Sequence, residues 1–279
     1  MVSERLMRLE FTKMNGAGND FVLVDNRTLS LTLTTDQIAS LCDRHRGVGA
    51  DGLLAVEPSR AGADFRMRYY NADGGEAEMC GNGARCFARF ARQLITGDQP
   101  QSLNFETQAG VISADFFGDQ VRLGMSKPHD YAAATELTAD GHAFDVAFLN
   151  TGVPHAVVMV EDLASVDVQS NGAAIRYHEH FAPRGTNVNF VAVDAPGRIR
   201  IRTYERGVEG ETLACGTGVV ACALIHHLST GTQAPISVTV EGGDTLSVGF
   251  EASAQTGDFD HVTLTGPADF VFSGSISIS

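Results

Sequence analysis

The sequence predicts a mixed α/β protein of the α+β type, with two pseudo-symmetric halves. Each half is expected to be a curved, mainly antiparallel sheet wrapped around a central helix. Short β-rich runs recur along the whole chain and are bounded by Gly, Asn or Asp, whereas few helical patterns interrupt them. In addition, one arrangement occurs twice: a strand, an acidic turn, a Cys-Gly-x-Gly segment and a helix.

The strand-like runs are rich in β-branched and aromatic residues, which pack well on a half-buried pleated surface. Each run is short because turn-forming residues end it. We expect strands at Phe21–Val24, Leu53–Val56, Phe65–Tyr70, Val111–Phe116, Val121–Met125, Ala156–Val160, Asn189–Val193, Ile199–Tyr204, Ser237–Val240 and His261–Leu264.

Three segments have helical patterns. Asp36–Arg44 begins with an aspartate, a residue type that caps helix N-termini. Ala84–Leu94 has an apolar stripe on one face and arginines on another, and Val219–Leu228 is apolar nearly all round. A helix that is apolar on every side is normally buried, so the last of these is expected at the centre of a sheet.

The duplicated arrangement divides the chain into similar parts. Cys80 and Cys215 are 215 − 80 = 135 residues apart, close to half of the 279-residue chain. We therefore predict an N-terminal half, 1–127, that carries Cys80 and a C-terminal half, 128–267, that carries Cys215, with an active cleft between them. The alternative is coincidence in a chain with 30 glycines.

The formal charge of −14 argues against nucleic acid or an anionic membrane as a partner, since both need a basic surface. A small anionic ligand is still allowed, because a local site can be positive on an acidic protein. The first eight residues lack the apolar core of a signal peptide. Five cysteines, an odd number, then favour reduced thiols and a cytoplasmic protein.

The two Cys-Gly-x-Gly segments suggest proton transfer at carbon. A cysteine followed by glycines at a helix start lies beside N–H groups and the positive end of the helix dipole. That setting favours a thiolate and also binds a carboxylate. Two such cysteines could move a proton from one face of a carbon to the other, with no cofactor. The alternative is that both are merely small residues at helix starts; Cys42, Cys86 and Cys222 lack this context and are expected in the core.

Several segments, in order and over nearly the whole chain, resemble the diaminopimelate epimerases, cofactor-independent enzymes that interconvert LL- and meso-diaminopimelate. The matching segments are Phe11–Phe21, Arg46–Gly52, Asn71–Gly74, Met79–Cys86, Pro154-His155, Thr186-Asn187, Tyr204–Gly207 and Ala214–Gly218.

The resemblance implies roles for particular residues. Cys80 and Cys215 would be the acid/base thiols, with His155 and Glu205 beside the reacting centre. Residues that would bind substrate are Asn19, Asn71, Gly81, Asn82, Asn187, Glu205, Arg206, Gly216 and Thr217. A guanidinium and neutral amides are the groups that a second amino-acid centre needs.

The resemblance also implies that the final segment, 268–279, packs with the first half, that the enzyme is a homodimer without cofactor, and that it serves lysine and peptidoglycan precursor synthesis. The sequence shows no metal-ligand pattern, so no metal is expected. Two positions depart from the family pattern. Many members have Gln where this chain has Gly52, and Asn where it has Val153. Thr151 or water would have to compensate for Val153, or recognition of the distal end of the substrate is looser.

Other interpretations remain open at this point. The same mechanism could act on proline, histidine or glutamate; the protein could bind an amino acid without catalysis; or Cys80 and Cys215 could form a disulfide as an inactive state. Gly47–Gly52 fits a dinucleotide fingerprint but lacks a strand before it and a helix after it. His178-Glu-His180 has no further metal-ligand pattern, and neither lysine, Lys13 or Lys127, suggests a pyridoxal phosphate site.

Overall fold

The structure is a computed structural model that describes residues 7–77, 79–253 and 258–278. Its chain contacts divide it into two compact units. The first unit runs to Leu123 and includes the segment from Gly266 onward, and the second unit is Gly124–Thr265.

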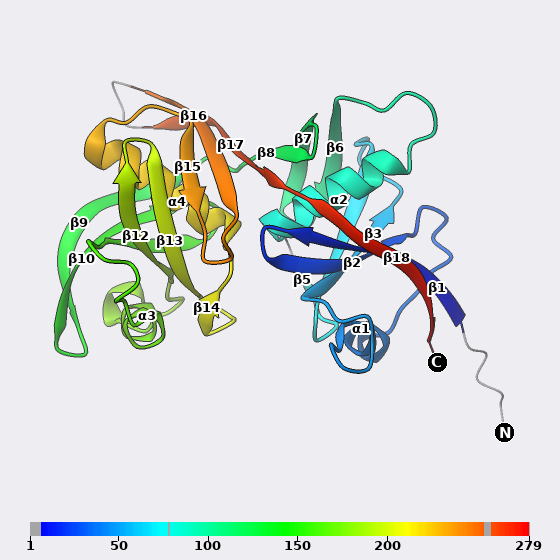
Figure 1. The fold of residues 1–279 in the computed structure, drawn as a ribbon, viewed down its shortest axis with the longest axis horizontal. Coiled ribbons are helices and arrows are strands. Elements are labelled where there is room, and N and C mark those ends of the chain that lie inside the picture. The colour runs from blue at the N-terminus through cyan, green and yellow to red at the C-terminus, as the bar shows by residue number, and fades with distance from the viewer. Residues whose placement is uncertain (1–6, 78, 254–257, 279) are drawn as a thin grey trace. The chain divides into compact units, whose positions relative to one another are not determined.

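The described part of the first unit contains helices α1 (Thr35–Cys42) and α2 (Gly81–Gln93). Its strands are β1 (Met7–Gly16), β2 (Asn19–Asp25), β3 (Gly52–Glu57), β4 (Phe65–Asn71), β5 (Glu76–Ala77), β6 (Ser102–Thr107), β7 (Gly110–Phe117), β8 (Gln120–Gly124) and β18 (Asp269–Ile278). The strand at the C-terminal end, β18, rejoins the first unit and pairs antiparallel with β1. Figure 1 shows β18 in red beside the blue β1.

The second unit contains α3 (Val168–Arg176), α4 (Gly216–Thr230) and the short 3₁₀ helix η1 (Glu179–Phe181). Its strands are β9 (His129–Ala139), β10 (His142–Asn150), β11 (Pro154–Met159), β12 (Asn187–Ala195), β13 (Arg198–Glu205), β14 (Gly210–Thr212), β15 (Ile236–Thr239), β16 (Thr245–Ala252) and β17 (Phe259–Pro267).

The two units have the same strand order. Pairing runs β18-β1-β2-β3-β4-β6-β7-β8 in the first unit and β9-β10-β11-β12-β13-β15-β16-β17 in the second. In each, the third and fourth strands and the fifth and sixth strands are parallel, and the other neighbours are antiparallel. A helix crosses over between the strands of each parallel pair. The predicted fold class is confirmed.

The second crossover helix of each unit packs against the inner face of its sheet. Helix α2 packs against strands β1 to β4, β6 and β7, and α4 against strands β10 to β13, β15 and β16. Every residue from Val219 to His226 is buried, as the apolar pattern predicted. Figure 1 shows each helix lying against the strands of its own unit.

The arginine face of α2 holds the returning C-terminal segment. Arg85, fully buried, donates to the carbonyl of Pro267 at 3.2 Å, and Arg89 donates to that of Ala268 at 2.6 Å. The guanidinium of Arg92 lies 4.6 Å from the ring centre of Phe116 on β7. These arginines are therefore part of the packing of the first unit.

Helix α3 had no counterpart among the predicted helices. Its sequence, Val-Gln-Ser-Asn-Gly-Ala-Ala-Ile-Arg, includes residues of low helix propensity at its centre. Asp167 caps it by accepting from the N–H of Ser170, and Gly172 lets it approach β13 closely. A Cβ at Gly172 would lie 2.5 Å from the Cβ of Tyr204, so tertiary packing explains this glycine.

Candidate active site

Cys80 and Cys215 occupy the same position in their units. Each is the N-cap residue of the second crossover helix, with an extended backbone (φ −135°, ψ 121° and φ −124°, ψ 107°). The first-turn N–H groups of a helix have no partner inside the helix and carry its positive partial charge. Both cysteines are therefore placed where a thiolate or a bound carboxylate is stabilised.

The first turn of α2 is held close to the strands beneath it. A Cβ at Gly16 would lie 2.7 Å from the carbonyl oxygen of Asn82, so the β1–β2 turn needs this glycine. On the other side, a Cβ at Gly83 would lie 3.3 Å from the ring of Phe21 and 3.5 Å from Leu54. Apolar side chains thus support the turn that follows Cys80.

The first turn of α4 has polar surroundings. Cys215 is buried, and its Sγ lies 3.5 Å from the hydroxyl of Thr217. Thr151, also buried, donates its hydroxyl hydrogen to the carbonyl of Thr217 at 3.0 Å. A Cβ at Gly218 would lie 2.4 Å from Oδ1 of Asn189, so this turn also requires a glycine.

His155 lies on β11 beneath this turn and is fully buried. Its Nδ1 is 3.2 Å from Nδ2 of Asn189, and a Cβ at Gly218 would lie 3.4 Å from its Cε1. Burial, with a smaller effect of the positive charge of Arg206, lowers the pKa of His155 to about 3. The imidazole is therefore neutral at physiological pH.

Asn187, Glu205 and Arg206 come together at the ends of β12 and β13. Asn187 accepts from the backbone N–H of Arg206 at 2.8 Å and donates to the carbonyl of Pro154 at 3.1 Å, so it links β11 to the turn after β13. Burial raises the pKa of Glu205. The guanidinium of Arg206 donates to the carbonyl of Arg184 at 3.5 Å, and none of the ion pairs found among the described residues includes it.

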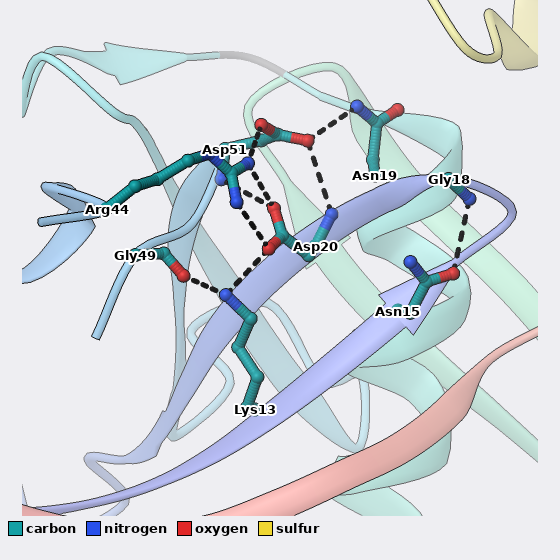
Figure 2. Close-up of polar contacts among 8 residues, drawn as sticks. All are labelled: Lys13, Asn15, Gly18, Asn19, Asp20, Arg44, Gly49 and Asp51. Carbon is teal, nitrogen blue, oxygen red and sulfur yellow. Dashed lines mark hydrogen bonds and ion pairs between the residues drawn. The ribbon is translucent and has the colours of Figure 1, made fainter. Parts of the chain in front are cut away.

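Asn19 belongs to a polar network at the start of β2, shown in Figure 2. Its Nδ2 donates to Asp51 at 2.9 Å, and its Oδ1 accepts from Nδ2 of Asn82 at 2.7 Å. Asp51 also accepts from Arg44 at 2.7 Å. The network therefore joins the start of β2 to the first turn of α2. The hydrogen bonds to Asp51 and Asn82 together set the orientation of the Asn19 amide.

The same network fixes the charge of Asp20. Its carboxylate forms ion pairs with Lys13 at 2.7 Å and with Arg44 at 2.8 Å, and Lys13 also donates to the carbonyl of Gly49 (Figure 2). Burial acts to raise the pKa of Asp20, but hydrogen bonds and charges from these two residues outweigh it and lower the pKa to about 2. Lys127, on the surface, pairs with Asp260. Both lysines of the chain are thus in ion pairs.

Gly52, unlike Val153, has a structural explanation. A Cβ at Gly52 would lie 2.4 Å from the carbonyl oxygen of Tyr70, so the β3–β4 pairing of this chain excludes a larger residue there. Asn71, at the exposed end of β4, is the register partner of Gly52. Near Val153, the hydroxyl hydrogen of Thr151 is committed to Thr217, so Thr151 can offer substrate only an acceptor.

Three cysteines and a glycine-rich segment lie outside the two Cys-Gly-x-Gly segments. Cys42, Cys86 and Cys222 are buried, as predicted, and burial raises the pKa of Cys42 to about 11 and that of Cys86 to about 12. Gly47–Gly52 follows α1 and runs into β3, which begins at Gly52, so the order of elements is the reverse of that at a dinucleotide site. Among the described residues, no three His, Cys, Asp or Glu side chains are grouped to hold a metal ion.

Sequence reasoning missed Asp51 and Asn189, because nothing in the local sequence shows what they contact. Asp51 immediately precedes a strand, and Asn189 is one polar residue in a predicted strand. Each becomes noticeable only through a distant partner, Asn19 for the first and Gly218 for the second.

Comparison with known proteins decides the family. The profile of the family described as diaminopimelate epimerase matches residues 11–129 and 147–271. The chain belongs to the diaminopimelate epimerase family. A diaminopimelate epimerase from Aquifex aeolicus is 43% identical, with 96% of this chain and 98% of the relative covered. One from Chlorobaculum tepidum is also 43% identical, with 95% and 100% covered.

Solved structures show that this epimerase fold is shared more widely. A phenazine biosynthesis protein of the PhzF family from Bacillus anthracis matches with a TM-score of 0.75 at 17% identity, covering 98% of this chain and 100% of that one. A hydroxyproline epimerase from Agrobacterium vitis matches with a TM-score of 0.71 at 16% identity, covering 100% and 94%. At these identities the likeness concerns the fold. No helix among the described residues is long and apolar enough to cross a membrane.

Proposed function

We propose that this protein interconverts LL- and meso-diaminopimelate by a two-base mechanism without a cofactor, in lysine and peptidoglycan precursor synthesis. The observation that carries the proposal is the duplicated N-cap cysteine. Cys80 and Cys215 are the N-cap residues of α2 and α4, which occupy equivalent places in the shared strand order of the two units. Each cysteine is followed by a Gly-x-Gly first turn. Full-length relatives of 43% identity carry the name of this activity.

In the proposed reaction, one cysteine thiolate takes the α-proton, so the C–H bond breaks and an S–H bond forms. The second cysteine, as a thiol, then gives its proton to the opposite face of the carbanion and becomes the thiolate. The two thiols therefore titrate as a pair, and each direction uses the opposite protonation state. Reversal of the reaction, or proton exchange with water, resets the enzyme.

First-turn N–H groups would stabilise the substrate carboxylate as charge develops on it. Gly81 and Asn82 provide them on α2, and Gly216 and Thr217 on α4. The partly buried Glu205 and the neutral His155 are proposed to act beside the reacting centre.

Asn19, Asn71, Asn187 and Arg206 are proposed to hold the substrate, several of them at its distal amino-acid centre. Arg206, which has no carboxylate partner among the described ion pairs, suits the distal carboxylate. Because Asn19 and Asn187 use part of their amide capacity within the protein, each retains one N–H for the substrate. Val153, which offers no polar side chain, leaves distal recognition to these residues.

Proton NMR of LL-diaminopimelate in D₂O, with reductant and no added cofactor, tests the function. Loss of the α-proton signal together with the appearance of the meso isomer is expected. A Cys80→Ala/Cys215→Ala double variant is the control for non-enzymatic exchange. Exchange with proline, histidine or glutamate but not with diaminopimelate would replace the substrate assignment, and no exchange with any of them would reject the epimerase proposal.

The proposal includes a cytoplasmic location and a homodimer. The location follows from the five cysteines, an odd number that favours reduced thiols, and the homodimer follows from the family resemblance. Light scattering on the purified full chain measures its mass directly: about twice the 29.6 kDa of one chain is expected, and a single-chain mass would contradict the dimer.

A further inference from the structure

The ring of His155 is held by the side-chain amide of Asn189. Nδ2 of Asn189 lies 3.2 Å from Nδ1 of His155 and 3.0 Å from the carbonyl oxygen of Ala156, and its Oδ1 accepts from the Thr203 hydroxyl at 3.0 Å. A backbone carbonyl can only accept a hydrogen bond. The nitrogen of the amide, not its oxygen, must therefore face Ala156.

This orientation determines where the proton on His155 lies. Nδ2 of Asn189 carries two hydrogens and can only donate, and it lies within hydrogen-bond distance of both Ala156 O and His155 Nδ1. Nδ1 must then be an acceptor without a hydrogen, so the neutral ring carries its hydrogen on Nε2. A second proton on Nδ1 would face the N–H of Asn189, which opposes the charged form.

Nε2 of His155 is buried, and no hydrogen-bond partner for it exists among the described residues. Its neighbour in the ring, Cε1, lies at the first turn of α4, 3.4 Å from where a Cβ on Gly218 would be. A buried polar atom left unsatisfied is unusual in a native protein. An N–H donor beside the positive N-terminal end of a helix is suited to bind a negatively charged oxygen or sulfur.

The first unit shows that the fold does not need this polar pair. The register pairs Phe21 with Gly52 on β2 and β3, and His155 with Asn187 on β11 and β12. Phe21 and Leu54 therefore take the positions under α2 that His155 and Asn189 take under α4. Phenylalanine and leucine complete the packing there without any hydrogen bond.

We propose that Asn189 is a positioning residue that holds His155 as a neutral Nε2–H donor. His155 uses this hydrogen to bind the negative charge that gathers at the N-terminus of α4, on the substrate carboxylate or the Cys215 thiolate, and does not itself take up a proton. This role rests on the proposed epimerase function.

The tautomer can be measured in the substrate-free protein. Long-range ¹H–¹⁵N NMR of protein labelled with [¹⁵N]histidine distinguishes a hydrogen on Nε2 from one on Nδ1, and His155 is assigned by the signal absent from His155→Phe. We expect the Nε2–H pattern, unchanged at a pH where exposed histidines are protonated. An Nδ1–H ring, or titration together with the exposed histidines, would overturn the proposal.

Two variants separate positioning from packing. Asn189→Leu removes the donor to Nδ1 and introduces the residue found at the equivalent position of the first unit. We expect mixed tautomers and a loss of roughly 10- to 100-fold in kcat with little change in KM. Thr203→Val removes only the bond to Oδ1 of Asn189, so the wild-type tautomer and most of the activity should remain. Wild-type kcat in Asn189→Leu, or an equal loss in Thr203→Val, would contradict the positioning role.

The donor role has its own pair of variants. His155→Gln keeps a neutral N–H donor that cannot act as an acid or base, whereas His155→Phe has none. We expect His155→Gln to retain more kcat than His155→Phe; equal losses would overturn the donor role. Circular dichroism and thermal unfolding of His155→Phe/Asn189→Leu check that loss of activity is not loss of fold.

Failure of this inference differs from failure of the proposed function. The tautomer is read without substrate, so an Nδ1–H ring overturns the positioning role even in an active enzyme. Absence of epimerisation by the wild-type protein would reject the proposed function whatever the tautomer.

Discussion

The two units share one strand order but place their buried polar groups differently. Beneath α2 the support is apolar, from Phe21 and Leu54, and the polar network lies at the strand ends around Asn19. Beneath α4 the support is polar, from His155 and Asn189, and the position two residues before His155, the counterpart of Asn19, is Val153. The duplicated fold therefore sets where the cysteines lie, while the side chains around them are specialised in each unit.

The largest effect is expected at the cysteines, where the two units should be equally necessary. Replacing either Cys80 or Cys215 by Ala removes one of the two proton-transfer groups. We expect a loss of about 10³-fold or more in epimerisation, measured by the NMR assay above. Full activity in either single variant would break the two-base mechanism and the functional equivalence of the two positions.

Gly218→Ala should have the next largest effect. The new Cβ would lie 2.4 Å from Oδ1 of Asn189, which must move and release His155. We expect a fall of roughly 1–3 kcal/mol in the free energy of unfolding, typical of overpacking, and a clear loss of kcat. Urea unfolding and the epimerase assay measure the two effects.

Gly83→Ala is the matched control in the first unit. Its Cβ would meet the ring of Phe21 at 3.3 Å, a contact that a small shift relieves. The loss of stability should be smaller than that of Gly218→Ala. Equal losses would show that the contrast between the two supports has no energetic consequence.

Asp20→Asn tests the charged network of the first unit. Since the pKa of Asp20 is lowered to about 2, its charge stabilises the folded state by about 2 kcal/mol at neutral pH. The stabilisation is complete above the unfolded pKa, near 4, and is lost as the pH falls toward 2. Urea unfolding should therefore show a deficit in the variant at pH 7 that shrinks in acid; a deficit independent of pH would point to packing instead.

Glu205→Gln tests a carboxyl of the second unit whose pKa is raised, whereas that of Asp20 is lowered. This substitution should have the smallest effect on stability. Burial raises the pKa of Glu205, so ionisation of this carboxyl destabilises the folded state as the pH rises through its pKa. Relative to wild type, the melting temperature of the variant should increase from pH 4 to pH 7. No change over that range would contradict the assigned burial cost.

The sequence predicted the repeated elements better than the side-chain contacts. Periodicity and turn residues identified the central helices and many strands, because one face or all faces of each are buried. Helix α3 was missed because its stability comes from packing of Gly172 on Tyr204, not from helix propensity. Arg85 illustrates the same limit, since its burial follows from a segment more than half the chain away.

The site residues also divide into those that local sequence identifies and those that only tertiary contacts reveal. The cysteines were found from local sequence, because a Cys-Gly-x-Gly segment before a helix has a local physical meaning. The contact of Asn189 with His155 depends on the register of two parallel strands, which a single sequence does not specify. Nor could the sequence show that Gly52 is enforced by the Tyr70 carbonyl.

The return of β18 to β1 sets an order of events during synthesis. In the second unit the edge position beside β10 is filled by β9, its immediate neighbour in sequence, whereas the equivalent position beside β1 in the first unit is filled by β18, which is translated after the whole second unit. Until β18 has been made, β1 has an unpaired edge, which is a site for aberrant pairing. The N-terminal unit, although made first, is therefore completed last, and a nascent chain stalled before Asp269 would leave that edge open to other chains.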